Sequence, residues 1–246
     1  MDTQALTILL AATVTLFASY IQSVTGFGFG IFAMIFLPSI LSYTEANVLS
    51  TVLSMLTSLV AVAFVLRRVD LKNLIFPTLG CLVSTYFAVA FISSQSSVVL
   101  TVLLGAVLFL LSIYFFFFTD KIRIKPTWYA GLIAGVLSGI LGGMFAIGGP
   151  PVVVYYMQSE REPDRYMATI SAYFVISGAI SVVTKATAGF FTATVWLALA
   201  AALVAMLLGS LAGKLTRSKI NPTLLKRLVY GFMAVSGIVN IVTALL

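Results

Sequence analysis

The chain alternates long apolar stretches with short polar segments, and most charged residues lie in the polar segments. Within the apolar stretches the hydrophobic positions are continuous rather than alternating, which favours helices over the strands of a membrane barrel. A helix of about 20 residues crosses a hydrocarbon core of about 30 Å. We therefore predict eight membrane-spanning helices. They cover Gln4–Thr25, Ala46–Leu66, Asn73–Ser93, Val98–Phe118, Thr127–Ile147, Tyr166–Thr184, Phe190–Ala212 and Thr223–Leu246.

Two glycine-rich breaks interrupt this pattern. The first reads Gly26-Phe-Gly-Phe-Gly30 and precedes the short apolar stretch Ile31–Leu41. The second reads Gly148-Gly-Pro-Pro151 and precedes Val152–Met157. Both short stretches are too brief for an ordinary span, so the charge of the loops must decide whether the chain turns back at each one.

The chain has 14 Lys and Arg residues, and their distribution predicts the topology. If the short stretches do not return across the membrane, the basic residues divide equally between the two sides. If each is a return limb, every basic residue except Lys185 falls on one side, as the positive-inside rule requires. We therefore predict two return limbs in a multi-pass protein of the cell inner membrane, with both termini external. The start Met-Asp-Thr-Gln has no basic region, so we expect the first span to be retained.

Return limbs give each half of the chain an odd number of crossings, so the halves would have opposite orientations. Small residues also recur at every fourth position in the first span of each half: Ala11, Thr15, Ser19 and Ser23 in one, and Gly131, Gly135, Gly139 and Gly143 in the other. The glycine stripe is typical of close helix packing. We predict an all-α membrane protein of two inverted repeats, each with four spanning helices plus a short return limb after a glycine-rich break. The first repeat covers 1–119, a cytoplasmic connecting loop 120–126, and the second repeat 127–246.

The composition excludes several functional classes. The chain is 61% hydrophobic and 9% charged, whereas soluble proteins have about 25% charged residues. It has no histidine and a single cysteine, which weighs against a metal site, a cofactor and an intramembrane enzyme. Membrane orientation explains the net charge of +7 better than nucleic acid does. No carboxylate is predicted at mid-membrane depth, where coupling acids of transporters usually lie.

The two breaks are the candidate substrate site. Glycine allows positive φ and leaves the backbone N–H groups uncovered, and proline suits the first turn of a helix. Two helix N-termini that face one cavity would bind an anion without a charged side chain. Polar side chains near the breaks could join them, although each could equally bond a neighbouring helix. The candidate residues are Gln22, Thr25, Gly26, Gly28, Gly30, Asn47, Thr51, Gly142, Gly143, Gly148, Gly149, Pro150, Pro151, Ser171 and Tyr173.

The first break, the second break Gly142-Gly-Met-Phe-Ala-Ile-Gly-Gly-Pro-Pro151 and the two-half layout together resemble the sulfite exporter TauE/SafE family of membrane permeases. The resemblance covers essentially the whole chain. It implies movement of a sulfur-containing anion such as sulfite or an organosulfonate, usually outward. It also implies a role in the site for the glycines and prolines of the two motifs.

We therefore expect export of a small sulfur-containing anion, with membrane lipid as the only other partner and the oligomeric state left open. A membrane potential that is negative inside favours anion exit by about 2.3 kcal/mol per charge per 100 mV. Two alternatives remain. The chain could import a related small anion, with backbone carbonyls as a cation site, or it could be a membrane scaffold or assembly factor that transports nothing. The short loops disfavour the scaffold.

Overall fold

The computed structural model describes residues 3–63, 65–118, 124–160 and 162–245. These residues form helices and contain no strand, which confirms the predicted all-α class. The α-helices are α1 (Thr3–Thr25), α2 (Phe29–Phe36), α3 (Tyr43–Ala63), α4 (Leu71–Ser93), α5 (Ser97–Phe118), α6 (Trp128–Phe145), α7 (Gly149–Ser159), α8 (Pro163–Thr187), α9 (Ala193–Thr216) and α10 (Pro222–Leu245). Short 3-10 turns at Leu37–Ser39 and Leu66–Arg68 follow α2 and α3. In the described part of the chain, 8 helices are long and apolar enough to cross a membrane, and α2 and α7 are the two that are not.

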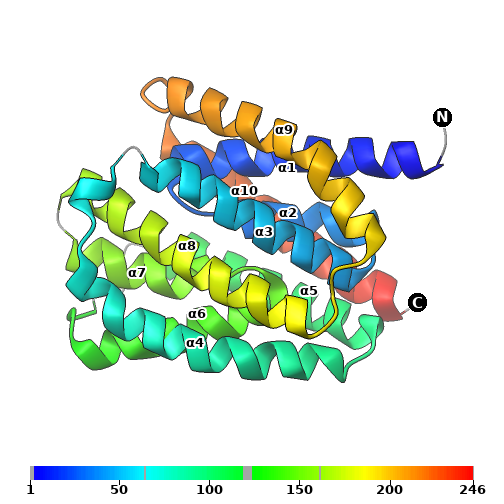
Figure 1. The fold of residues 1–246 in the computed structure, drawn as a ribbon, viewed down its shortest axis with the longest axis horizontal. Coiled ribbons are helices and arrows are strands. Elements are labelled where there is room, and N and C mark those ends of the chain that lie inside the picture. Colours follow the sequence, from blue (N-terminus) through cyan, green and yellow to red (C-terminus); the bar gives the residue numbers. More distant parts are fainter. Residues whose placement is uncertain (1–2, 64, 119–123, 161, 246) are drawn as a thin grey trace.

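The short helices α2 and α7 are the two predicted return limbs. Each follows a glycine-rich break, and they run toward opposite ends of the bundle (Figure 1). As a result, α1 begins and α10 ends at one end, which we call the terminal end. The helices α4, α6, α8 and α10 all begin at the other end, which we call the basic end because Arg67, Lys72, Lys125 and Arg165 lie beside these helix starts. The start of α1 and the end of α10 thus lie opposite the basic segments, and the side of the membrane that each end faces stays a prediction.

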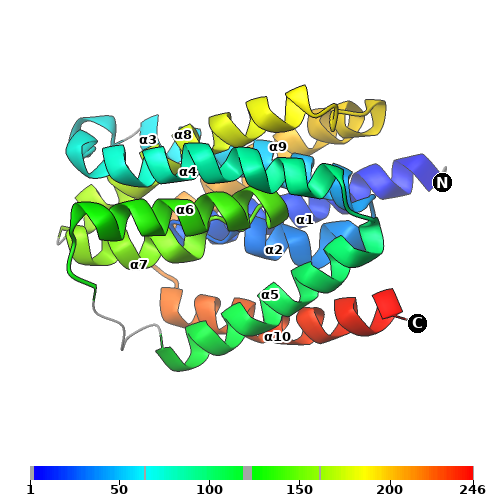
Figure 2. The same cartoon turned by 90° about the horizontal axis from the view of Figure 1, so that it is seen from below.

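Three long helix pairs build the bundle: α1 lies along α9, α4 along α6, and α5 along α10 (Figures 1 and 2). Glycines make these contacts close. A Cβ atom on Gly135 would lie 2.0 Å from the Pro77 carbonyl oxygen of α4, and one on Gly209 would lie 2.2 Å from the Leu16 carbonyl oxygen of α1. The glycine stripe of α6 is thus a packing face, as its spacing predicts.

The helix boundaries differ from the predicted spans by three or four residues at both ends of α3, α8 and α9, and α8 begins at Pro163 and continues to Thr187. Lys185, predicted to lie in an external loop, is instead in the last turn of this helix and is buried. That prediction was wrong because a span was assumed to end before the first charged residue. The predicted boundary between the first repeat and the connecting loop, at residues 119–120, lies outside the described residues.

Candidate functional site

The first break reverses the chain between α1 and α2. Gly26 and Gly28 have φ values of 86° and 105°, in the left-handed region that glycine adopts without strain. Gly28 is the N-cap of α2, so the free N–H groups of the first turn of α2 lie at the break. Gly30 follows inside α2, and a Cβ atom there would lie only 1.8 Å from the Ala146 carbonyl oxygen. The two breaks are therefore in direct contact.

The second break separates α6 from α7. Ala146 ends α6 in a left-handed conformation, with φ of 56°, and its N–H group donates to the Gly142 carbonyl at 3.0 Å. The prolines Pro150 and Pro151 lie in the first turn of α7, as predicted. Since proline has no N–H group, α7 offers fewer donors than the prediction of two equivalent helix N-termini assumed. Most of the backbone N–H groups at the breaks that have no acceptor within their own helix therefore belong to α2.

A cavity of about 70 Å³ lies where the breaks meet, and we call it the break cavity. It is large enough for a few water-sized groups. Seven of the predicted site residues line it: Gln22, Gly28, Gly30, Thr51, Gly142, Gly148 and Gly149. The cavity also has hydroxyl groups that are not among the predicted site residues, from Ser54, Thr85, Ser138, Ser177 and Ser181. Backbone and hydroxyl groups thus supply most of its polar lining, and apolar side chains such as Phe27, Met55 and Phe174 complete the wall.

Four other predicted residues hold the breaks in place rather than line the break cavity. The Thr25 hydroxyl bonds to the Ile21 and Phe27 carbonyls at 2.8 and 2.6 Å. The Asn47 side-chain amide donates to the Met144 carbonyl at 2.6 Å, just before the second break. A Cβ atom on Gly26 would lie 2.8 Å from the Met167 sulfur, and one on Gly143 would lie 2.7 Å from the Ala88 Cβ. These contacts support a structural role for these residues, in which each contacts a neighbouring element instead of the substrate.

The remaining predicted residues lie elsewhere. Pro150 and Pro151 form the first turn of α7 without lining the break cavity. Tyr173 is fully buried and packs against the rings of Tyr156 and Phe174, each with a centroid distance of 5.8 Å.

Ser171 lines a second cavity of about 130 Å³ between α1, α3, α8 and α9, which we call the basic-end cavity. Its wall also includes Ser23, Ser210, Lys214 and Arg217. Both basic residues are exposed and belong to the end of α9 at the basic end. Ser23 follows directly on Gln22 of the break cavity, so the two cavities lie on neighbouring residues of α1.

Lys185 is the residue that sequence reasoning missed. Its side chain is fully buried, and its ammonium donates to the Thr51 hydroxyl at 2.6 Å and to the Gly142 carbonyl at 3.4 Å. Both acceptors line the break cavity. None of the ion pairs among the described residues includes Lys185. One feature of the sequence could have predicted its burial: Lys185 comes directly after the apolar stretch of a predicted helix.

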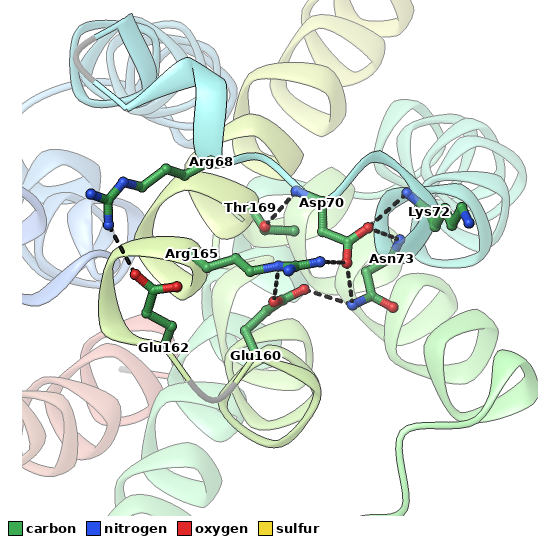
Figure 3. Close-up of polar contacts among 8 residues, drawn as sticks. All are labelled: Arg68, Asp70, Lys72, Asn73, Glu160, Glu162, Arg165 and Thr169. Carbon is green, nitrogen blue, oxygen red and sulfur yellow. Dashed lines mark hydrogen bonds and ion pairs between the residues drawn. The ribbon is translucent and has the colours of Figure 1, made fainter.

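A polar network joins two connections at the basic end (Figure 3). Arg165 of α8 forms ion pairs with Asp70, the N-cap of α4, and with Glu160, the latter at 2.9 Å. The Asn73 amide donates to Glu160 at 2.6 Å and to Asp70 at 3.3 Å.

Alongside this network, Arg68 pairs with Glu162 at 2.9 Å and with Asp164 at 2.6 Å. The described carboxylates therefore lie at helix ends, as predicted.

The network also sets the charge of Asp70. Burial acts to raise the pKa of its carboxyl group, but the hydrogen bond from Arg165 and the backbone N–H groups of Asn73 and Lys72 outweigh burial. The pKa of Asp70 is therefore held below its ordinary value, and the carboxylate is charged at neutral pH.

Residues 11–239 match the sequence pattern of the sulfite exporter TauE/SafE family. The chain is also similar to a protein of Cupriavidus necator that is described as a probable sulfite/organosulfonate exporter TauE. The two are 25% identical over 228 residues, which cover 87% of this chain and 86% of that protein. No solved structure matches the chain.

Proposed function

The chain belongs to the sulfite exporter TauE/SafE family of membrane transporters, and we propose that it exports a small sulfur-containing anion, sulfite or an organosulfonate, through the break cavity. The name of the Cupriavidus necator relative supports this class of substrate. The observation that carries the proposal is the break cavity itself, where two interrupted helices meet and leave backbone donors uncovered.

The physical basis for anion binding is the start of α2. The first N–H groups of a helix have no acceptor within that helix, and the helix dipole places partial positive charge there. Gly28, Gly30 and Ile31 at this start all line the break cavity. Irregular backbone persists at membrane depth only where it is buried in protein or lines a cavity. Serine and threonine hydroxyls of the same wall add neutral donors.

The route toward the basic end would pass through the basic-end cavity. Gln22 separates it from the break cavity, and its amide donates to the Ser54 carbonyl at 3.2 Å and to the Ser58 hydroxyl at 2.7 Å. These bonds connect α1 to α3 and would have to rearrange for an anion to pass. Lys214 and Arg217 would attract anions to the outer mouth of this route. We place this mouth on the cytoplasmic side, because the basic end of a membrane protein normally faces the cytoplasm.

The helix pairing supports a transport mechanism based on two inverted repeats. If α1–α5 correspond to α6–α10, the pair of α1 with α9 in one half has its counterpart in the pair of α6 with α4. The pair α5 with α10 and the contact of α3 with α8 then map onto themselves. In this arrangement the breaks meet at the repeat interface, where such transporters bind their substrates.

Efflux from liposomes tests both the proposal and its direction. Vesicles that contain the purified protein are loaded with sulfite, a potential negative inside is imposed at equal pH on both faces, and the sulfite released is measured. We expect efflux to accelerate with the potential, since each exported negative charge moves down the field. Glu45→Gln should slow efflux only modestly, because Glu45 bonds to Ser42 and Thr192 at 2.7 and 2.8 Å and does not line the break cavity.

The alternatives give different results in the same assay. Efflux that ignores the potential, follows a pH gradient and stops in Glu45→Gln would replace the proposal with acid-coupled transport. Uptake that needs a cation gradient would indicate an importer. A chain that is inserted and folded but moves neither sulfite nor a sulfonate would be a scaffold.

A further inference from the structure

Lys185 is a buried lysine in the last turn of the membrane-spanning helix α8, and its side chain reaches Thr51 of α3 and Gly142 of α6. Its side chain is fully buried, whereas the next three residues, Ala186, Thr187 and Ala188, are exposed. A lysine near a helix end usually extends its ammonium outward to the polar interface. Lys185 does the opposite, so proximity to the membrane surface does not explain it.

The partners of Lys185 carry no negative charge. The Thr51 hydroxyl donates to the Asn47 carbonyl at 2.8 Å and accepts from the Lys185 ammonium. The second acceptor, the Gly142 carbonyl, also receives the Ala146 N–H group. Among the described residues no carboxylate pairs with Lys185. Burial of a charged ammonium costs far more than burial of a neutral donor, and these two neutral acceptors do not offset that cost.

The ammonium lies next to the break cavity, where a bound anion could pair with it. Thr51 and Gly142 both line the break cavity, and so does Ser181, one helical turn before Lys185. The Ser181 hydroxyl is buried and has no hydrogen-bond partner within the described part of the chain. The ammonium thus bonds to two residues of the cavity wall, and Ser181 contributes an unsatisfied hydroxyl group to the same wall.

We propose that Lys185 is the counter-charge for an anion in the break cavity, and that Thr51 and Gly142 hold its ammonium when the cavity contains no anion. This inference rests on the proposed function and adds the residue that makes the site select a negative charge. The backbone donors at the start of α2 bind any small group that accepts hydrogen bonds, and the helix dipole adds a partial preference for negative charge. The lysine distinguishes an anion from a neutral molecule of the same shape.

Two ligands of similar shape and different charge test this inference. Methanesulfonate is a monoanion, and dimethyl sulfone replaces one of its oxygens with a methyl group and is neutral. Calorimetry on the purified protein in detergent should show that methanesulfonate binds at least roughly tenfold more tightly than dimethyl sulfone. In Lys185→Gln, which keeps an N–H donor, this preference should fall several-fold, to the part that the start of α2 supplies. Lys185→Arg should retain most of it, and Lys125→Met, an equivalent loss of charge at an exposed position, should leave it unchanged.

The outcomes separate this inference from the proposed function. If the wild-type protein transports sulfite and Lys185→Gln still prefers methanesulfonate as strongly as the wild type, the inference is wrong and the proposed function stands. If the wild-type protein neither transports sulfite nor binds methanesulfonate, both are wrong. Should Lys185→Gln fail to fold, the wild-type preference decides: equal affinity for the two ligands excludes a counter-charge.

Discussion

Gly30 lies at the tightest contact between the two breaks. A Cβ atom there would be 1.8 Å from the Ala146 carbonyl oxygen and 2.9 Å from its carbon. Both are backbone atoms, which cannot rotate away as a side chain does. Gly149, in the first turn of α7, is a suitable comparison, because a Cβ atom there would meet only the side chains of Phe27 and Phe174, at 3.6 Å or more.

We predict that Gly30→Ala lowers the free energy of unfolding by at least about 1–3 kcal/mol, the usual cost of forcing a methyl group into a packed interior. Gly149→Ala should change it by less than about 0.5 kcal/mol. Thermal unfolding of the two variants in the same detergent measures the difference. Equal melting temperatures would mean that the breaks are not in contact.

The residue scale is also where sequence reasoning was least complete. The positive φ values of Gly26 and Gly28 were expected, because alternating glycines in an apolar stretch have few other uses. The burial of Lys185 was not, since a charged residue after an apolar run reads as the start of a loop. Its position depends on which way the last turn of α8 faces, and that is set by packing against α3 rather than by local sequence.

Arg165 links two elements that are far apart in the chain. Its guanidinium connects the N-cap of α4 to Glu160 at the end of α7 (Figure 3). The Glu160 side chain is only 2% exposed, so its carboxylate depends on Arg165 and Asn73 for compensation. The network therefore holds the start of α4 against the α7–α8 connection.

We predict that Arg165→Met lowers the melting temperature, because it leaves the buried Glu160 carboxylate without its charged partner. Arg67→Met is the matched control, since Arg67 is exposed and forms no ion pair within the described residues. Thermal unfolding measures both. The contribution of Asp70 should be complete above its ordinary pKa of 3.8 and be lost as the pH falls through its lowered pKa. An unchanged melting temperature in Arg165→Met would show that the network adds nothing to stability.

At the scale of elements, the sequence predicted the number of long and short helices correctly. Continuous apolar runs predicted eight long helices, and loop charge predicted two short return limbs between them. Boundaries were less accurate. The helix α8 extends three residues past each predicted end, because Pro163 begins it as a first-turn proline and Lys185 continues it inward.

Cysteine labelling can test which face of the membrane each end of the whole molecule lies on. In a chain with Cys81→Ser, single cysteines replace Ala188 in the α8–α9 connection and Ser218 in the α9–α10 connection, both exposed and at opposite ends (Figure 1). We predict that a membrane-impermeant thiol reagent added outside labels Ala188→Cys and spares Ser218→Cys, because the basic end should face the cytoplasm.

Labelling after permeabilisation is the control, and it should modify both positions. Protection of Ala188→Cys with labelling of Ser218→Cys from outside would reverse the predicted orientation. Labelling of both from outside would indicate that the chain inserts in two orientations.

The inverted repeat stays a prediction at this scale. The two halves have no long identical segments, so sequence comparison alone supports it weakly. The exchange of helix partners between the halves, with α1 on α9 and α6 on α4, is the arrangement that such a repeat requires. No pattern within one half could have predicted it, because each pair joins helices from both halves.

The opposed directions of α2 and α7 affect the energy profile of a permeating anion. Their positive ends converge at the breaks, and their negative ends point toward opposite membrane faces. An anion would therefore meet one electrostatic minimum with a rise on either side, rather than a slope from one face to the other. Such a profile favours neither influx nor efflux of the anion: the two short helices bind the anion at the breaks but do not set the direction of flow. Net flow would then reverse whenever the sum of the concentration gradient and the voltage reverses.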